Sequence, residues 1–539
     1  MKTEHVYSRR WAILAVLCVS LLVVGLDNTI LNVALPTLVR DLHASASQLQ
    51  WIVDAYTIVF AGLEITAGSM GDRLGRKGAL FAGLAIFGAG SALSAFSTSP
   101  DELVAFRCLM GVGGALVMPS TLSILTNVFT GPHERAKAIG IWSGTSGLGI
   151  AIGPVLGGWL LDHFWWGSVF LVNVPIVAVG LVAIILLVPT SSDPAARRAD
   201  SVGTALSIAG LGLLLYGIIE VPVDGWGALS VYGSLIGGLV VIAAFVVWEL
   251  NCDHPMFQMS FFKDARFSAA NVSITLVFFS LFGALFILTQ YLQSVLGYSP
   301  LAAGVRTAPV ALMIGLGAPL STAAVRKVGT KVVVAGGLLA VAGGLAILTQ
   351  VTVSSGYLPV LAGLLVLGLG MGAAMAPATD SIMGSLPKEQ AGVGSAMNGT
   401  TIQVGGALGV AVLGSIVEQR YRDHVTRGLA GQHVPPVAFH YITSSLGGAL
   451  AVASHLPATT GGLLVALARQ GFVNGVTFAS IVAALVAACG VLVAAIFLPA
   501  RVQPAAEGAP GDRQVSGTAP AQAPETAVST VAGPEEASA

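Results

Sequence analysis

Residues 332–379 contain no Asp, Glu, Lys or Arg, and a short break at 352–359 divides them into two apolar stretches. Each stretch has the roughly 20 residues that a helix needs to cross the apolar core of a bilayer. Similar stretches recur along the chain, so that only 9% of its 539 residues are charged, against about 25% in an average soluble domain. So few charges cannot cover the surface of a soluble protein of this size. The sequence therefore predicts an all-α, polytopic membrane protein and excludes a soluble enzyme.

Fourteen segments are long and apolar enough to be membrane spans. They are residues 11–35, 50–70, 77–97, 103–127, 138–161, 169–188, 201–219, 229–249, 268–290, 302–325, 332–351, 358–380, 391–416 and 472–498. With the N-terminus in the cytoplasm, nearly all Lys and Arg residues of the short loops face the cytoplasm, and only Arg40 and Arg306 lie outside. We therefore expect a multi-pass protein of the cell membrane with both termini in the cytoplasm.

Two short patterns occur twice and indicate an internal repeat. Residues 72–77 are echoed by 326–331, and residues 118–124 by 376–382, at nearly the same separation. Two six-helix bundles related in parallel are an architecture of transporters, with the substrate site between them. The predicted organisation is a cytoplasmic N-terminus (1–10), an N-terminal bundle (11–188), a linker with two extra transmembrane helices (189–250), a C-terminal bundle (251–498) that includes an outer loop (417–471), and a disordered cytoplasmic tail (499–539).

The loop between the second and third spans combines glycines with charges. Its candidate gate residues are Gly68, Gly71, Asp72, Arg73, Gly75, Arg76 and Lys77. The first two glycines allow close approach of helices, and Gly75 allows a tight turn. We expect Asp72 to face the positive N-terminal end of a helix in the other bundle, which would lock the cytoplasmic side shut in one state. The alternative is that the three cations serve only as a topology signal.

The fifth span carries glycines at every fourth position. Gly149, Gly153 and Gly157 share one helical face, where they let a neighbouring backbone come close, and Pro154 bends the helix. Together with Gly158 they form a smooth face that suits a helix rocking or sealing against another. Packing of small residues without motion is the alternative interpretation.

These motifs, in this order, resemble those of the major facilitator superfamily. The 68–77 loop is similar to its motif A, and residues 149–158 are similar to motif C, which is associated with antiporters. Residues 26–36 resemble the first-span motif of the fourteen-span drug:proton antiporter family, the multidrug efflux type. The matching motif positions in that first span are Asn28, Thr29, Asn32 and Pro36. The resemblance implies two bundles that expose a central site alternately to the two sides of the membrane.

The chain departs from the family pattern at two positions. Met110 stands where motif B of the family has Gln, so the amide at that position is missing. In the second copy of motif A, Arg326 stands at the place that matches Asp72. We therefore expect only one of the two gates to carry an acid.

Ionisable residues inside the predicted spans point to the mechanism, because an ionised side chain at bilayer depth costs from about 2.5 kcal/mol upward. The candidates for proton and substrate coupling are Asp27, Asp54, Arg107, Glu64 and Asp380. The first three lie at a similar depth, so we expect them to meet, and the family resemblance assigns Asp27 and Arg107 to coupling. Glu64, about 15 Å deeper by helix rise, is either a counter-charge for the substrate or a headgroup-level residue. Asp380 either joins the pathway or serves the end of its helix.

We therefore predict a proton-coupled antiporter that exports lipophilic, cationic or amphipathic drugs or toxic compounds, such as antibiotics. A guanidinium beside Asp27 favours the ionised acid and burial without it favours the neutral acid, so a rocking motion would load and release a proton. The expected partners are the substrate, protons and membrane lipids. No nucleic acid is expected at a net charge of −1, and a single chain should suffice. No cofactor is expected, and the four widely separated Cys residues predict no metal site.

Two alternatives stay open. The same fold could export one endogenous metabolite or lipid. In a different class, the chain could be a non-transporting membrane sensor or a lipid-modifying enzyme, although no loop gathers a nucleophile, a base and an orienting acid. An importer is disfavoured by the resemblance of residues 149–158 to the antiporter motif.

Overall fold

The structure is a computed structural model that describes residues 7–192, 200–256, 258–386 and 391–499. Throughout these residues the secondary structure is helical, and no strand occurs among them. The first six residues and nearly all of the predicted tail 499–539 lie outside the described residues.

Fourteen spans in the described chain are long and apolar enough to cross a membrane, one for each predicted segment. Ten are single helices: α2 (Arg10–Asp41), α3 (Ala46–Leu74), α4 (Arg76–Ala95), α5 (Pro100–Val128), α6 (Pro132–His163), α9 (Ser201–Asp224), α10 (Leu229–Asn251), α14 (Thr330–Leu348), α15 (Leu358–Gly384) and α16 (Ala391–Gly428). Three are composite: α7 (Ser168–Leu171) with α8 (Asn173–Leu187), α11 (Ala265–Gln290) with η2 (Tyr291–Val295), and α12 (Pro300–Thr307) with α13 (Pro309–Val328). The last is α19 (Ala458–Phe497), and a short helix, η1 (Met259–Lys263), precedes α11.

The two sequence patterns that suggested a repeat form the same local structure. Helix α3 gives way to α4 at Gly75, with φ of 128°, and α13 gives way to α14 at Gly329, with φ of 85°. Only glycine adopts such angles without steric cost, so each pattern reverses the chain through a single residue. This correspondence supports two related halves.

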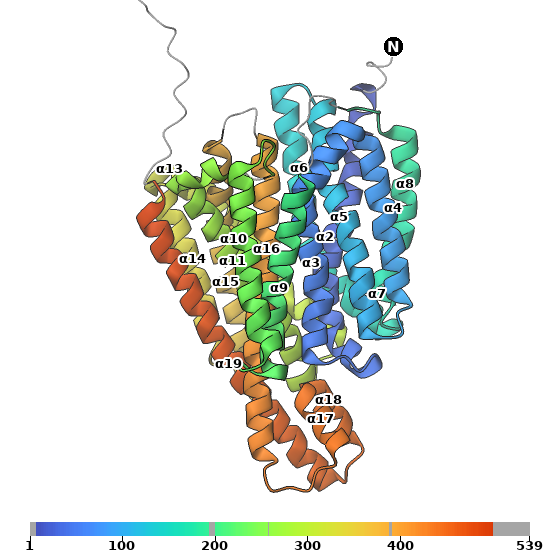
Figure 1. The fold of residues 1–539 in the computed structure, drawn as a ribbon, viewed down its shortest axis with the longest axis vertical. Coiled ribbons are helices and arrows are strands. Elements are labelled where there is room, and N and C mark those ends of the chain that lie inside the picture. Colours follow the sequence, from blue (N-terminus) through green and yellow to red (C-terminus); the bar gives the residue numbers. More distant parts are fainter. Residues whose placement is uncertain (1–6, 193–199, 257, 387–390, 500–539) are drawn as a thin grey trace, which may run out of the picture. The chain divides into compact units, whose positions relative to one another are not determined.

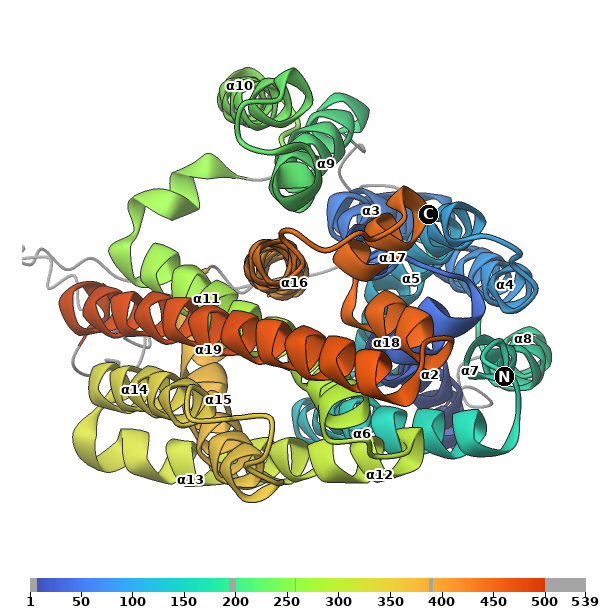
Figure 2. The same cartoon turned by 90° about the horizontal axis from the view of Figure 1, so that it is seen from below.

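The helices form two groups, which we call the N-half (α2–α8) and the C-half (α11–α19). The two most extensive contacts between the halves are those of α3 along α16 and of α6 on α12. The extra helices α9 and α10 pack on each other, and α9 also packs against both α3 and α16 (Figure 2). The inserted pair therefore covers one of these two extensive contacts and leaves the other uncovered.

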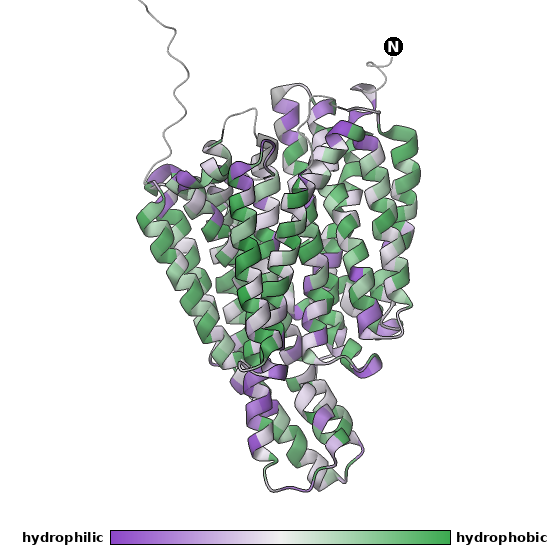
Figure 3. Ribbon diagram, in the orientation of Figure 1, coloured by the Kyte–Doolittle hydropathy of each residue, from purple (hydrophilic) through white to green (hydrophobic). Residues whose placement is uncertain are grey.

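Helices α16 and α19 continue beyond the other spans at one end, which we call the hairpin end (Figure 1). Between them lie two short helices, α17 (Pro436–Ser444) and α18 (Leu446–Ser454). Residues 417–471, interpreted from the sequence as a loop, are therefore largely helical. Hydrophobic residues cover the sides of the spans, whereas hydrophilic residues gather near their ends and on the extension of α16 (Figure 3). Helix α2 begins, and α19 ends, at the opposite end (Figure 1).

Candidate functional site

Asp27 of α2 and Arg107 of α5 form an ion pair inside the N-half. Nη1 of Arg107 donates to Oδ2 of Asp27 at 2.5 Å, and both residues are at most 1% exposed. The other carboxylate oxygen, Oδ1 of Asp27, is buried and has no hydrogen-bond partner among the described residues. The sequence prediction that these two residues meet is therefore confirmed in the structure.

The backbone of α3 and an aromatic ring hold the guanidinium in place. Nε of Arg107 donates to the carbonyl oxygen of Ile52 at 2.9 Å, and its Cζ lies 4.3 Å from the centre of the Tyr56 ring. Met110, at the place of the missing motif B amide, puts its sulfur 4.0 Å from Nη1. A thioether is only a weak acceptor, so Asp27 is the strong partner of this cation.

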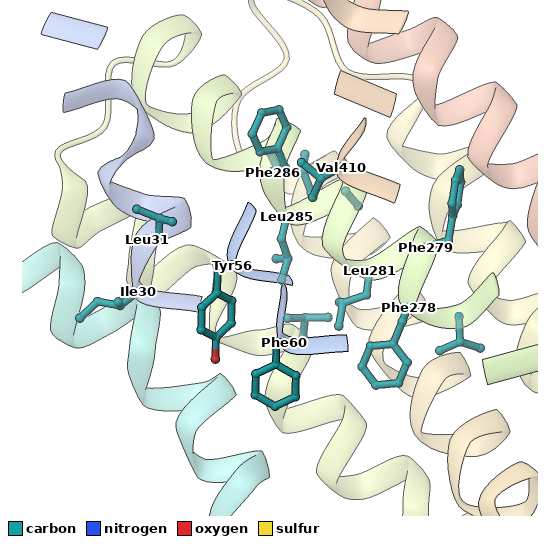
Figure 4. Packing of buried hydrophobic residues seen from close by; sticks show 14 of the residues in the cluster. Ile30, Leu31, Tyr56, Phe60, Phe278, Phe279, Leu281, Leu285, Phe286 and Val410 are labelled. Atoms are coloured by element: carbon teal, nitrogen blue, oxygen red, sulfur yellow. The ribbon is translucent and has the colours of Figure 1, made fainter. Parts of the chain in front are cut away.

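Arg107 also lines a small pocket between the two halves. The N-half contributes Asn28, Leu31, Asn32, Val53 and Thr57, and the C-half contributes Phe282, Gln403, Gly406 and Val410. Oδ1 of Asn32 is buried and has no hydrogen-bond partner among the described residues, so a polar atom lies beside the apolar walls of the pocket. Leu31, Phe286 and Val410 lie among the apolar side chains of α2, α11 and α16 near this pocket (Figure 4). Such a mixture of apolar walls and few polar groups is typical of small-molecule sites.

Asp54 does not join the pair of Asp27 and Arg107, which corrects the prediction that the three meet. Its side chain is fully buried, and neither carboxylate oxygen has a hydrogen-bond partner among the described residues. Asp54 lies four residues after Gln50 and four before Ile58, and both of these contact α16. Residues at this spacing share one face of a helix. Asp54 therefore lies on the α16-facing side of α3, away from the backbone that binds Arg107.

Glu64 lies on the same face of α3 and is 2% exposed, so it is not at a solvated boundary. Its Oε2 accepts from the Thr400 hydroxyl of α16 at 3.5 Å, and a Cβ added to Gly399 would lie 2.8 Å from the same oxygen. Asp380 is exposed near the end of α15 and does not share their burial. The buried candidates Asp54 and Glu64 thus share the contact between α3 and α16, which we call the α3–α16 seam.

The glycines of the fifth span pack against α2. A Cβ at Gly149 would lie 2.8 Å from the carbonyl carbon of Gly25, and one at Gly153 would overlap Thr29. Gly157 makes the same kind of close approach to Ile30. The Thr29 hydroxyl donates to the carbonyl oxygen of Gly149 at 3.3 Å, which ties the first-span motif to the fifth span. Asn28 and Asn32 donate to carbonyls of their own helix, and Pro36 is buried inside α2.

The end of the same helix contacts the other half. A Cβ at Gly158 would lie 2.5 Å from Cα of Leu301, and one at Gly304 would overlap the carbonyl oxygen of Pro154. Gly140, Gly144 and Gly147, earlier in α6, have no neighbour within 4 Å of an added Cβ. We call the contact of α6 with α12 the α6–α12 seam. It is tightly closed at the hairpin end and open toward the opposite end.

The candidate gate loop makes its contacts within the N-half. Oδ1 of Asp72 accepts from Nε of Arg76 at 2.6 Å, and Nζ of Lys77 donates to the carbonyl oxygen of Ile185 at 2.9 Å. Gly68 and Gly71 approach Pro119 and Ser120 of α5. Arg73 is exposed. In this conformation Asp72 has no ion pair with the C-half among the described residues.

Residues 17–410 match the major facilitator superfamily. The chain is a member of the major facilitator superfamily. Multidrug efflux pump LfrA of Mycolicibacterium smegmatis is 37% identical over 485 residues, covering 90% of this chain and 95% of that protein. The tetracenomycin C resistance and export protein of Streptomyces glaucescens is 35% identical, covering 90% of this chain and 91% of that protein. The methyl viologen resistance protein SmvA of Salmonella typhimurium is 32% identical, covering 86% and 93%.

The fold also matches solved structures. A bacterial homolog of the human lysosomal transporter Spinster, in an inward-facing and unoccupied conformation, gives a TM-score of 0.65 at 18% identity and covers 92% of this chain and 99% of that one. The family and the fold class predicted from the motifs are thus confirmed. This member of the superfamily is a multi-pass membrane transporter and not an enzyme.

Sequence reasoning did not select three acids that are buried in this transporter, Asp200, Glu249 and Glu418, and Glu418 is the one that lies between the halves. It is 4% exposed, and its Oε2 accepts from Nε2 of Gln50 at 3.4 Å across the α3–α16 seam. Oε1 of the same Gln50 accepts from the Ser415 hydroxyl at 3.2 Å. The omission arose because the thirteenth span was ended at residue 416. Val417, Tyr421 and Val425 continue an apolar face at helical spacing, and this pattern would have extended the helix past Glu418.

Proposed function

We propose that the protein exports lipophilic drugs or toxic compounds, cationic or amphipathic in character, across the cell membrane in exchange for protons. The observation that carries the proposal is the buried pair of Asp27 and Arg107, whose guanidinium also lines the pocket between the halves. Any motion that reshapes this pocket acts on the counter-charge of Asp27. The three named relatives are efflux or resistance proteins, and they support this direction of transport.

Proton exchange follows from the cost of burying an unpaired charge. With Arg107 at 2.5 Å, the ionised form of Asp27 is stabilised by a charge-assisted hydrogen bond. When a change in the pocket that Arg107 lines draws the guanidinium away from Asp27, the same carboxylate becomes an isolated buried charge, and binding a proton removes that cost. Proton release on one side and proton binding on the other are thereby coupled to the movement of the pocket.

We assign the two ends of the protein to the two sides of the membrane from the basic residues of the loops. Because most of them lie at the end where α2 begins, we assign that end to the cytoplasm and the hairpin end to the outside. The α6–α12 seam, tight at the hairpin end, then closes the outer side. The described conformation is accordingly one that takes up substrate from the cytoplasm.

The energetics favour more than one titrating acid. Exporting a compound against a hundredfold gradient costs about 2.8 kcal/mol, and one entering proton supplies about 2.3 kcal/mol per 100 mV of membrane potential. For a monovalent cation, the outward charge cancels the inward charge of one proton, so the potential contributes nothing. A second proton restores that contribution. Asp54 and Glu64, buried on the α3–α16 seam, are our candidates for the second acid.

Export of a single endogenous compound is the second candidate function. It is favoured by the relatives from antibiotic-producing bacteria, including the tetracenomycin C resistance and export protein. A panel of chemically unrelated substrates in cells that lack other pumps separates the two functions, because a narrow exporter would clear one class only.

Inverted membrane vesicles test the proposed function directly. Uptake of a lipophilic cationic dye should follow an imposed inside-acid pH gradient and collapse with a protonophore. Asp27→Asn should abolish the response, whereas Asp41→Asn, an exposed acid at the end of the same helix, should retain it. Full pH-driven uptake by Asp27→Asn would remove this pair from the mechanism.

A further inference from the structure

A second, small pocket lies at the hairpin end and is lined by Glu418. The nearby charged groups are Arg422, one turn farther along α16, and Glu220 of α9. Arg422 does not neutralise Glu418 by an ion pair, and instead donates to the carbonyl oxygens of Pro222 and Val223. Glu418 is thus a buried acid whose described hydrogen bond comes from the neutral amide of Gln50. Burying a carboxylate between two halves without a cation is costly, so such a site favours a positively charged guest.

The walls of this pocket suit a flat or bulky apolar cation. Phe286 of α11, Tyr421 of α16 and Phe472 of α19 line it together with Glu418 and Gln50. Aromatic rings attract cations through their faces and also bury apolar surface. A carboxylate among three aromatic side chains therefore has the chemistry to bind a lipophilic organic cation.

The two pockets follow one another along the same helices. Phe282 of α11 and Val410 of α16 line the central pocket, and Phe286 and Gly414, each four residues farther on, line the second. Four residues correspond to about 6 Å of helix rise. A guest that leaves the central pocket toward the hairpin end therefore reaches Glu418 next.

The short helices α17 and α18 form a roof that contacts both halves. The hydroxyl of Tyr421 donates to the carbonyl oxygens of Ile442 at 2.7 Å and Ser445 at 3.1 Å, which fixes the roof to the C-half. A Cβ at Gly447 would overlap the side chain of Val39 in α2, so the roof also touches the N-half. Separation of the halves at this end must break one of these contacts and uncover the pocket.

We propose that this second pocket is an exit-side binding site for lipophilic organic cations, with Glu418 as its counter-charge and the α17–α18 roof as its cover. The inference rests on the proposed function, because it assigns the site a place on the export path. It further narrows the substrate class. Compounds that carry a positive charge gain binding free energy from Glu418, whereas neutral compounds of the same shape do not.

The test compares two probes of similar shape, tetraphenylphosphonium, which is a cation, and triphenylphosphine oxide, which is neutral. Binding of each to the purified full chain in lipid nanodiscs is measured together with its transport in inverted vesicles. Glu418→Gln should weaken binding of the cation at least about tenfold, equal to ~1.4 kcal/mol, and leave the neutral probe unchanged. Glu418→Asp should restore part of the loss. Asp423→Asn, at an exposed acid on the same helix, is the matched control.

A second variant keeps the test decisive if Glu418→Gln is poorly folded. Leu446→Trp fills the pocket from its roof and leaves the acid in the sequence, and it should also impair the cation's transport. Unchanged handling of the cation by both variants, or equal loss of the cation and the neutral probe in Glu418→Gln, would overturn the proposal. Absence of pH-driven transport in the unmodified protein would instead contradict the proposed function, and the binding measurement would still decide the role of Glu418.

Discussion

The α3–α16 seam and the α6–α12 seam both join the two halves, but they do so with different chemistry. The α3–α16 seam buries acids and their partners: Asp54 and Glu64 on one helix, and Glu418 on the other. The α6–α12 seam is built from glycine and backbone, with Gly158 against Leu301 and Gly304 against Pro154. Its acid in the described structure, Asp162, is exposed and accepts from the Ser299 hydroxyl at 3.0 Å.

The difference assigns separate tasks to the two seams. A contact between glycines and backbone depends on shape alone, so it closes or opens irrespective of pH. A contact that buries carboxylates changes its free energy when they take up or lose protons. Helix α9 covers the α3–α16 seam and not the α6–α12 seam (Figure 2). It therefore shields the buried acids of the α3–α16 seam from the lipid. We therefore expect mechanical closure at the α6–α12 seam and, in addition to the Asp27–Arg107 pair of the N-half, a second proton site at the α3–α16 seam.

The largest expected effect comes from blocking closure of the α6–α12 seam. Any side chain at Gly304 meets the carbonyl oxygen of Pro154, so Gly304→Val should prevent tight closure at the hairpin end. Overpacking costs of about 1–3 kcal/mol would reduce transport roughly ten- to a hundredfold. Gly315→Val, on the same span but with no neighbour within 4 Å, is the control. Normal transport by the Gly304 variant would show that this close contact is not needed.

A smaller effect is expected at Glu64, the buried acid of the α3–α16 seam that lies farthest along α3. Glu64→Gln removes a titrating group without changing its shape, so export of a monovalent cation should fall about tenfold and should stop responding to an imposed membrane potential. The response to a pH gradient should remain, because Asp27 is intact. Vesicles with a potassium diffusion potential measure this directly. An undiminished response to the potential would exclude Glu64 as the second proton site.

A still smaller effect is expected at the gate loop, which lies at the end opposite the hairpin end. Asp72 bonds Arg76 and not the C-half here, so Asp72→Asn should cost this conformation only a part-exposed ion pair and should destabilise more strongly the alternate one in which that end is closed. A carboxylate at a helix terminus contributes about 0.3–1 kcal/mol, which corresponds to a roughly two- to fivefold shift toward the conformation described here. Labelling of single cysteines placed at the two ends reports the shift. Increased labelling at the hairpin end would contradict the assignment.

The smallest effect is expected at Asp162, the exposed acid of the α6–α12 seam. Asp162→Asn removes one solvated hydrogen bond to Ser299, so transport should stay within about twofold, and its pH dependence should not move. Transport rates over a range of external pH provide the measurement. A displaced pH profile in this variant would erase the proposed distinction between the seams.

Much of the fold could be predicted because hydropathy and helix length fix the number of spans almost independently of packing. Each predicted segment corresponds to one observed span, and the glycine turns at Gly75 and Gly329 follow from local sequence. The extension of α16 was missed because a hydropathy criterion ends a span where charge begins, although the helix continues to Gly428. Length and composition alone do not show that a helix can leave the membrane and remain buried against other parts of the same protein.

The candidate site was only partly predictable because depth along a helix does not specify rotation about it. Asp27, Asp54 and Arg107 have similar depths, and the structure joins only the first and third. The position of Asp54 follows once Gln50 and Ile58 are known to face α16, and that knowledge requires the tertiary contacts. The substitution of Met110 for an amide was visible in the sequence, but its consequence, an Arg107 whose strong partner is Asp27, was not.

Proton release on substrate binding tests the central claim most directly. The purified full chain in nanodiscs, in weakly buffered solution with a pH indicator, is mixed with tetraphenylphosphonium, and the protons released per bound cation are counted. The account predicts release from the unmodified protein, less from Glu64→Gln, and no change from Asp162→Asn. Cation binding without any release of protons at pH values across the neutral range would contradict it.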